Sequence, residues 1–144
     1  MTTTGLPLPG ALPSAPMANV PADLLYSKEH EWVKLDDDVA TVGITDYAQS
    51  SLGDIVYVEL PRVGADLAQF GSIGVVESVK AVSDIFTPVG GEVVGINDGL
   101  DNDPAAVNND PYGEGWFFKV KLADVSQTAN LLTPEQYEQL IAEG

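Results

Sequence analysis

The segment GSIGVVESVKAVSDIFTPVGG, from Gly71 to Gly91, indicates the fold more strongly than any other part of the chain. Two short apolar segments, Ile73–Val79 and Ile85–Pro88, lie on either side of Lys80. Apolar runs of this length, bounded by Gly and Pro, predict β-strands, so Lys80 is expected at or beside the turn that joins them. A side chain at the tip of a hairpin points into solvent, where a modifying enzyme can reach it.

The chain around this segment is rich in short strands from Tyr26 onward. Glu31–Leu35 and Val39–Ile44 alternate on either side of an acidic turn, which predicts a hairpin. Further strands are expected around Leu67 and over Ile55–Leu60, Val93–Ile96 and Trp116–Leu122. Short antiparallel strands at this spacing predict a mainly β fold, a flattened barrel or sandwich hybrid.

Helices are predicted at two places by their capping residues. Thr45 as a cap and Gly53 as a stop bound a short internal helix. Thr133-Pro134-Glu135-Gln136 has the cap, the proline and the glutamine that begin a C-terminal helix. A further helix is expected over Asp124–Leu131. The segment Asn97–Gly115 lacks the Gly and Glu positions of a calcium-binding loop, so turns are predicted there.

The 144 residues are enough for one domain, preceded by a segment of different composition. Five of the ten prolines fall in residues 1–22, and the first charged residue is Asp23. We predict a flexible tail over 1–22 and one domain over 23–144. The tail resembles neither a signal peptide nor a transit peptide, so a cytoplasmic protein is expected.

The chain is strongly acidic, with 6 Lys and Arg against 22 Asp and Glu and a formal net charge of -16. This balance argues against binding to nucleic acid, because phosphate contacts need clustered Lys and Arg. It also argues against docking on anionic membranes. Partner proteins with basic docking surfaces are favoured instead.

Conventional catalysis has few candidate residues. The chain has no Cys, so a thiolate metal site and a cysteine nucleophile are excluded, and His30 is its one histidine. No serine lies in a nucleophile elbow that could use His30 as its base. We therefore expect no catalytic residue, no metal site and a structural role for His30. As separate expectations, the protein is predicted to be a monomer and not an enzyme.

The residues around Lys80 resemble the biotinyl and lipoyl carrier family, and within it the glycine cleavage H-proteins. The family pattern has a Gly nine residues before the lysine, Glu-Ser or Glu-Thr before it and Ala after it. An acidic residue, a small-Pro pair and a Gly follow. The chain supplies every element: Gly71, Glu77-Ser78, Lys80-Ala81, Asp84, Thr87-Pro88 and Gly91. Biotin carriers place Met on both sides of the lysine, so Val79 and Ala81 favour lipoate.

Three further motifs narrow the resemblance to the H-proteins. They are His30-Glu31-Trp32, the segment Gly43–Gln49 with Leu52–Pro61, and Asn109–Trp116. Together with the Lys80 pattern, they cover about residues 24 to 143 in order.

The resemblance implies a carrier with lipoate attached covalently to Lys80. It also implies that Glu31 and Asp84 lie near the place where the loaded arm docks, while Glu29 stands where some relatives have Ser. The implied partners are glycine decarboxylase with pyridoxal phosphate, an aminomethyltransferase with tetrahydrofolate, dihydrolipoamide dehydrogenase and lipoylating enzymes. The lipoyl arm would carry the aminomethyl group of glycine between them.

Two alternatives remain open. A lipoyl domain of a 2-oxoacid dehydrogenase would have the Lys80 pattern, but the motifs at His30 and Asn109 have no role there. An unmodified scaffold or binding protein of the same fold would lack the lipoyl group altogether, and the mass of the intact protein distinguishes it.

Overall fold

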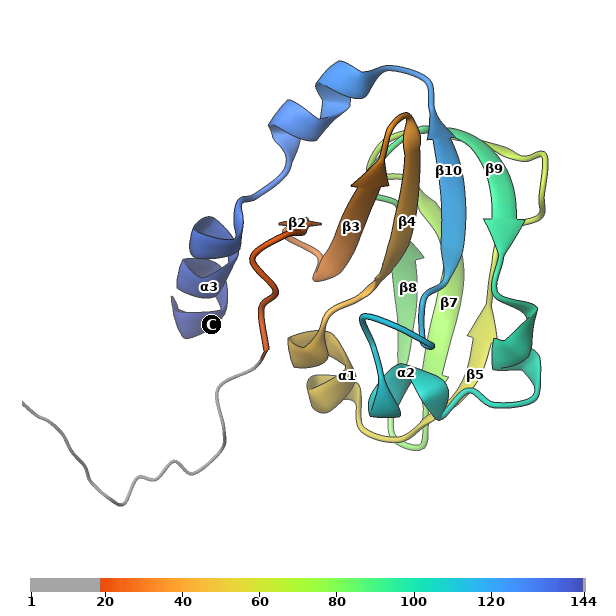
Figure 1. Ribbon diagram of the computed structural model, residues 1–144. Coiled ribbons are helices and arrows are strands. Elements are labelled where there is room, and N and C mark those ends of the chain that lie inside the picture. Colours follow the sequence, from red (N-terminus) through yellow and green to blue (C-terminus); the bar gives the residue numbers. More distant parts are fainter. Residues whose placement is uncertain (1–18, 144) are drawn as a thin grey trace, which may run out of the picture.

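The protein is a sandwich of two antiparallel sheets (Figure 1), and the computed structural model describes residues 19–143 of it. The larger sheet has the order β2 (Leu25–Tyr26), β3 (Glu31–Asp36), β4 (Val39–Ile44), β10 (Phe118–Leu122), β9 (Gly91–Ile96) and β6 (Asp66–Leu67). The smaller sheet has the order β5 (Ile55–Glu59), β7 (Ser72–Ser78) and β8 (Val82–Phe86). The mainly β sandwich predicted from the sequence is confirmed.

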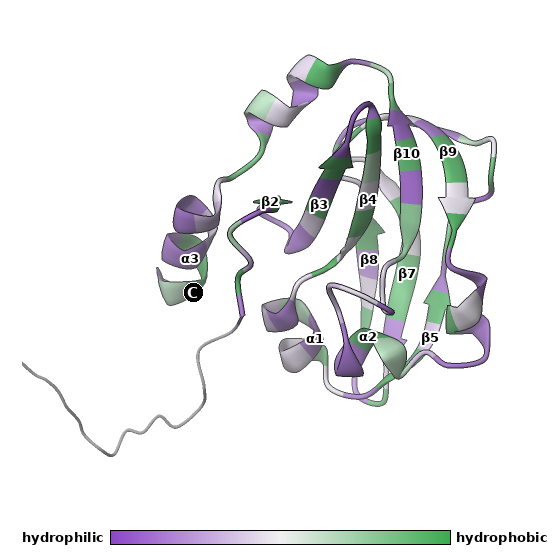
Figure 2. Cartoon of the chain, in the orientation of Figure 1, coloured by the Kyte–Doolittle hydropathy of each residue, from purple (hydrophilic) through white to green (hydrophobic). Residues whose placement is uncertain are grey.

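The hydrophobic core lies between the two sheets. Val42, Phe118 and Val120 of the larger sheet are fully buried, and they belong to the same cluster as Val76 and Ile85 of the smaller one. Strand β10 shows the pattern most clearly, because its apolar residues are buried and its two lysines are exposed (Figure 2). This period of two is what a strand with one face in a core requires.

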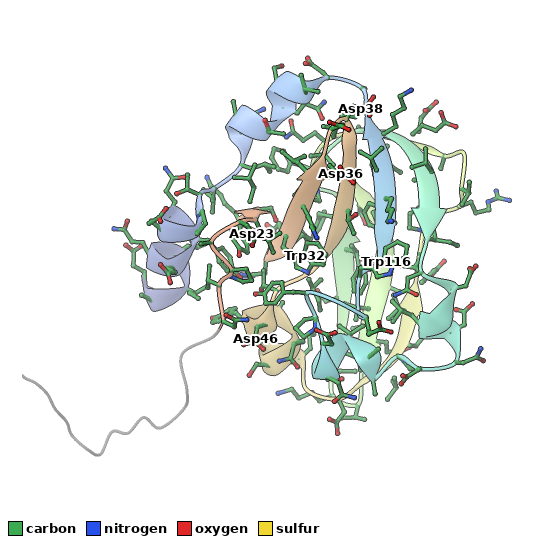
Figure 3. The ribbon with its side chains drawn as sticks, viewed as in Figure 1. Asp23, Trp32, Asp36, Asp38, Asp46 and Trp116 are labelled. Carbon is green, nitrogen blue, oxygen red and sulfur yellow. The ribbon has the colours of Figure 1, made fainter. Side chains whose placement is uncertain are left out.

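The predicted hairpin is formed by β3 and β4, whose register pairs Trp32 with Gly43. A Cβ on Gly43 would lie 2.7 Å from three atoms of the indole ring, so Trp32 packs here because its neighbour has no side chain. The acidic turn lies at the other end of the hairpin, near the labelled Asp36 and Asp38 (Figure 3).

Both helices predicted from capping residues are present. Helix α1 (Asp46–Leu52) begins at Thr45, which accepts a hydrogen bond from Ala48 N, and it ends at Gly53 with φ 84°. Helix α3 (Pro134–Glu143) begins with reciprocal hydrogen bonds between Thr133 and Gln136. It lies beside β2, at the edge of the larger sheet (Figure 1).

Other boundaries differ from those expected. The segment predicted as turns contains a 3-10 helix, η1 (Asp98–Asp101), and one α-helical turn, α2 (Ala106–Asn109). The helix expected before α3 is a 3-10 helix, η2 (Val125–Asn130). Trp116 precedes β10, because its amide bonds to Gly113 in a turn rather than to a strand. Strand β8 begins earlier than predicted, at Val82, because Ser83 and Asp84 pair with β7 in spite of their polarity.

The predicted tail lies mostly outside the described residues, which begin at Asn19. Inside the described part, Asn19 N donates to the Asp46 carboxylate, and Tyr26 donates to the carbonyl of Pro21. Among residues 19–143, no helix has the length and the apolar character needed to cross a membrane.

Candidate functional site

Lys80 lies at the turn between β7 and β8, as the sequence predicts, and its side chain is exposed. Ser78 closes this turn: its amide donates to Ala81 O at 2.8 Å, and its hydroxyl oxygen accepts from the amides of Ala81 and Lys80 at 3.1 and 3.3 Å. Val79 N donates to Asp54 O at 3.0 Å, which ties the turn to the start of β5. The turn is therefore fixed while the lysine projects from it.

The support beneath Lys80 comes from the end of α1. Lys80 Cε lies 3.5 Å from the point that a Cβ on Gly53 would occupy. Asn108 of α2 holds this corner with three hydrogen bonds of 2.9 Å, donating to Gly53 O and Gln49 Oε1 and accepting from Ile55 N. The predicted turn-rich segment thus contributes the side chain that fixes the base of the site.

Glu31 is a buried carboxyl group at the start of β3, with 2% of its surface exposed. Ser27 donates its hydroxyl proton to Oε1 at 2.5 Å, and Phe86 N donates to Oε2 at 3.4 Å. Burial raises the pKa of Glu31 to about 8, because these hydrogen bonds offset only part of the lost hydration. Glu31 is therefore mostly protonated at neutral pH.

An open cleft of about 390 Å³ lies next to this carboxyl group. We call it the Phe86 cleft, and it is lined by Ser27, Lys28, Glu29, Phe70, Phe86, Asn130 and Leu132. The two residues that bind the Glu31 carboxyl, Ser27 and Phe86, both belong to its wall. Glu31 itself does not line the cleft; its carboxyl group lies behind these two residues.

Asp84 occupies a different place, exposed on the outer face of β8. Residues two apart on a strand share a face, so Asp84 lies between Val82, next to the turn, and Phe86 in the cleft wall. No hydrogen bond within residues 19–143 joins Asp84 to Glu31. The structure therefore does not bring the two predicted carboxyl groups together, because Glu31 is buried and Asp84 is exposed on β8.

Helix α1 connects the two halves of the site. Its cap residue Thr45 donates from its backbone amide to His30 O at 3.0 Å, next to Glu31, and its last residue precedes Gly53 under Lys80. Seven helical residues span about 10 Å. The β7–β8 turn and α1 lie at the same end of the sandwich (Figure 1).

The His30 side chain lies against two tyrosines. Its ring lies 4.9 Å from the ring of Tyr47, and its Nδ1 is 2.9 Å from the hydroxyl oxygen of Tyr137. Burial lowers the pKa of His30, so the imidazole is neutral at pH 7. Its backbone has a φ of 73°, in the left-handed region that residues with a side chain rarely adopt.

The motif Asn109–Trp116 packs against the same end of the fold. Trp32 Nε1 donates to Pro111 O at 3.0 Å, and the Tyr112 hydroxyl accepts from Asp46 N at 3.0 Å. Trp116 lies farther along, beside β10, where Lys119 Nζ is 5.2 Å from its ring centroid (Figure 3). This motif therefore holds the first turn of α1 rather than entering the cleft.

Several residues of the site were not singled out from the sequence, namely Ser27, Phe86, Asn108 and Tyr137. Ser27 lies only four positions before Glu31, and a hydroxyl so close to a buried carboxyl was a usable signal. The other three contact residues 53 to 107 positions away, so no local pattern identifies them.

Comparison with known proteins assigns the family. The model of the glycine cleavage H-protein family matches residues 24–144. A glycine cleavage system H protein of Carboxydothermus hydrogenoformans is 52% identical over 127 residues, covering 88% of this chain and 98% of the relative. The one from Opitutus terrae is 58% identical over 126 residues, with 87% and 99% covered.

A solved structure leads to the same family. The crystal structure of a glycine cleavage system H protein from Mycobacterium marinum superposes with a TM-score of 0.80, at 38% identity, over 85% of this chain and 99% of that one. The range matched by the family model includes Lys80, Glu31 and every residue that lines the Phe86 cleft. The chain belongs to the glycine cleavage H-protein family.

Proposed function

We propose that Lys80 is the attachment point of a lipoyl group, through which this member of the glycine cleavage system carries its cargo. The observation that supports this most strongly is an exposed lysine on a turn that Ser78 and Asp54 hold fixed. An amine presented in this way can enter the active site of a modifying enzyme, and acylation turns its stem into a long neutral tether. The residues present therefore fit the group.

The lipoyl group, when bound, supplies a disulfide that accepts the aminomethyl group of glycine and passes it on. The protein's own part is to present one arm in turn to a pyridoxal phosphate decarboxylase, a tetrahydrofolate-dependent aminomethyltransferase and dihydrolipoamide dehydrogenase. Tethering raises the local concentration at each of these sites without free diffusion. None of the chain's own side chains is assigned a catalytic step. A cytoplasmic location and a monomeric state stay predictions.

Between visits, the loaded arm is proposed to fold along α1 and β8 into the Phe86 cleft. An arm seated there displaces water from the cleft, so loss of the aminomethyl group as formaldehyde and ammonia is slowed. Glu31 is well placed to hold the amine, since Ser27 and Phe86 of the cleft wall bind its carboxyl. An amine that arrives as an ammonium ion pairs with the Glu31 carboxylate, so docking on protonated Glu31 releases one proton to solvent.

The attachment site is tested by intact mass after co-expression with a lipoylating enzyme. The wild-type chain is expected to gain one lipoyl increment, and fragmentation should place it on Lys80. Lys80→Arg keeps the charge but loses the acylated amine, so it should gain none. Lys34→Arg alters an equally exposed lysine and should be modified like the wild type. A modified Lys80→Arg chain would contradict the proposal, and an unmodified wild type would favour the scaffold alternative.

The cleft is tested by the rate at which the loaded carrier releases formaldehyde. Glu31→Gln keeps the shape of the side chain but cannot become an anion, so we expect release about tenfold faster, the loss of one charge-assisted hydrogen bond. Asp84→Asn alters a solvent-exposed carboxylate along the route, where we expect about twofold, as for a screened surface pair. Equal rates for Glu31→Gln and wild type would eliminate the proposed role of Glu31.

A further inference from the structure

One hydroxyl group joins three distant parts of the chain. Tyr137 of α3 is fully buried, and its hydroxyl oxygen lies 2.9 Å from His30 Nδ1 and 2.7 Å from Thr45 Oγ1. These partners are 107 and 92 positions away in the sequence. Burial raises the pKa of Tyr137, so its hydroxyl stays a donor at physiological pH. The C-terminal helix is therefore bound to both His30 and the cap of α1.

The two partners of the Tyr137 hydroxyl, His30 and Thr45, lie close to Glu31 in the fold. His30 has a left-handed backbone, which is strained for a residue with a side chain and persists only where its surroundings enforce it. The residue after it is Glu31, so the direction of the Glu31 side chain depends on the His30 backbone. Thr45 begins α1, and its amide donates to His30 O. Tyr47 of the same helix lies against the His30 ring.

We propose that Tyr137 is a positioning residue of the Phe86 cleft, whose hydroxyl fixes His30 and the start of α1 so that Glu31 faces the docked arm. The inference rests on the proposed function of the cleft. The C-terminal helix does not line the cleft. Through Tyr137, however, it helps to shelter the cargo.

Tyr26 provides a matched control for the loss of a hydroxyl group from this aromatic stack. Tyr26 lies flat against Tyr137, with ring centroids 4.6 Å apart and 9° between the planes, and it is equally buried. Its hydroxyl donates to Pro21 O, and within residues 19–143 it forms no hydrogen bond with His30 or Thr45. Tyr26→Phe and Tyr137→Phe thus remove the same atom from the same stack, but only the second removes the link to His30.

The first measurement uses the protein without its arm. Nitrogen-15 shifts of the His30 imidazole and carbon-13 shifts of the Glu31 carboxyl are followed against pH in the wild type and both variants. Tyr137→Phe is expected to move the His30 Nδ1 resonance and to lower the Glu31 titration midpoint toward that of an exposed glutamate. Tyr26→Phe should leave both at the wild-type values. Unchanged shifts in Tyr137→Phe, or equal shifts in both variants, would overturn the inference.

The second measurement is formaldehyde release from the loaded carrier. Tyr137→Phe is expected to release about fivefold faster, the factor that one neutral hydrogen bond is worth, and Tyr26→Phe at the wild-type rate. In a Glu31→Gln background, Tyr137→Phe should add nothing, because it acts through Glu31. If Glu31→Gln is fast but Tyr137→Phe is not, the inference alone fails. If Glu31→Gln itself matches the wild type, the cleft proposal fails, and the inference fails with it.

Discussion

At the scale of single residues, Glu31 shows how burial changes the chemistry of a common side chain. A glutamate on the surface is an anion at pH 7, whereas this one has a pKa of about 8 because it has lost its hydration. Ser27 and Phe86 supply hydrogen bonds but no positive charge. Such a group is poised to ionise when a cation arrives, because a nearby positive charge lowers the pKa of a carboxyl.

The raised pKa of Glu31 predicts how stability depends on pH. The folded state holds the Glu31 proton up to about pH 8, while the unfolded chain releases it near pH 4.5. This contribution is therefore complete below pH 4.5 and is lost as the pH rises toward 8. At about 1.4 kcal/mol for each pKa unit, the loss is on the order of a few kcal/mol.

Urea unfolding between pH 5 and pH 8.5 measures this effect against Glu31→Gln. The free energy of unfolding of the wild type should fall relative to that of the variant as the pH rises, because glutamine does not titrate. Other groups titrate alike in both proteins and cancel. A difference that stays constant over this range would mean that Glu31 is already ionised in the folded protein.

At the scale of elements, the Lys80 hairpin depends on a neighbouring helical turn. Asn108 of α2 satisfies two backbone groups at the corner between α1 and β5, Gly53 O and Ile55 N. Asp54 lies between them, and its carbonyl accepts from Val79 N in the turn. The position of the lysine therefore depends on a segment 28 residues later in the chain.

Asn108→Ala is predicted to lower the free energy of unfolding by about 1–2 kcal/mol, because it leaves partly buried polar groups without a partner. Hydrogen exchange of the Val79 amide should become faster, since its acceptor loses support. The neighbouring Asn109 is exposed, so Asn109→Ala should stay within about 0.5 kcal/mol of the wild type and leave that exchange unchanged. Unaltered Val79 exchange in Asn108→Ala would show that the turn is held by Ser78 alone.

At the scale of the whole molecule, we predict that the net charge of -16 steers the carrier toward basic docking surfaces on its partners. Electrostatic attraction toward a basic docking surface raises the association rate and weakens with salt. We predict that kcat/KM of the decarboxylase for the carrier falls about tenfold between low and physiological ionic strength. Steady-state kinetics at increasing NaCl concentrations measure this dependence.

Two variants, each lacking one negative charge, test which end of the molecule is attracted to the basic surface of the partner. Asp54 lies beside the Lys80 turn, whereas Asp38 lies at the acidic hairpin turn of β3 and β4, at the other end of the sandwich (Figure 3). Both side chains are exposed, so each substitution by Asn removes one charge with little effect on folding. Asp54→Asn should reduce the salt dependence more than Asp38→Asn. Equal effects would mean that the partner responds to total charge rather than to the end bearing Lys80.

Helices, strands and turns that are specified by residues close to them in the chain could be predicted from the amino-acid sequence alone. The β3–β4 hairpin follows from alternation around an acidic turn, α1 and α3 follow from their caps, and the Lys80 turn follows from two apolar strands around one lysine. Each of these signals lies within about ten residues of the feature it specifies. The position of Lys80 in a turn, and the family pattern around it, therefore needed no knowledge of long-range contacts.

The surroundings of the lysine, by contrast, depend on the tertiary fold. The Phe86 cleft forms where the loop before β3, the end of β8 and the segment after η2 meet. The Glu31 carboxyl accepts from the amide of Phe86, 55 residues later, and His30 is fixed because Tyr137 reaches it across 107 residues. Strand pairing between distant segments creates these contacts, and a pKa depends on the resulting burial rather than on neighbours in sequence. The lysine turn is thus specified locally, while the Phe86 cleft and the burial of Glu31 are products of the whole sandwich.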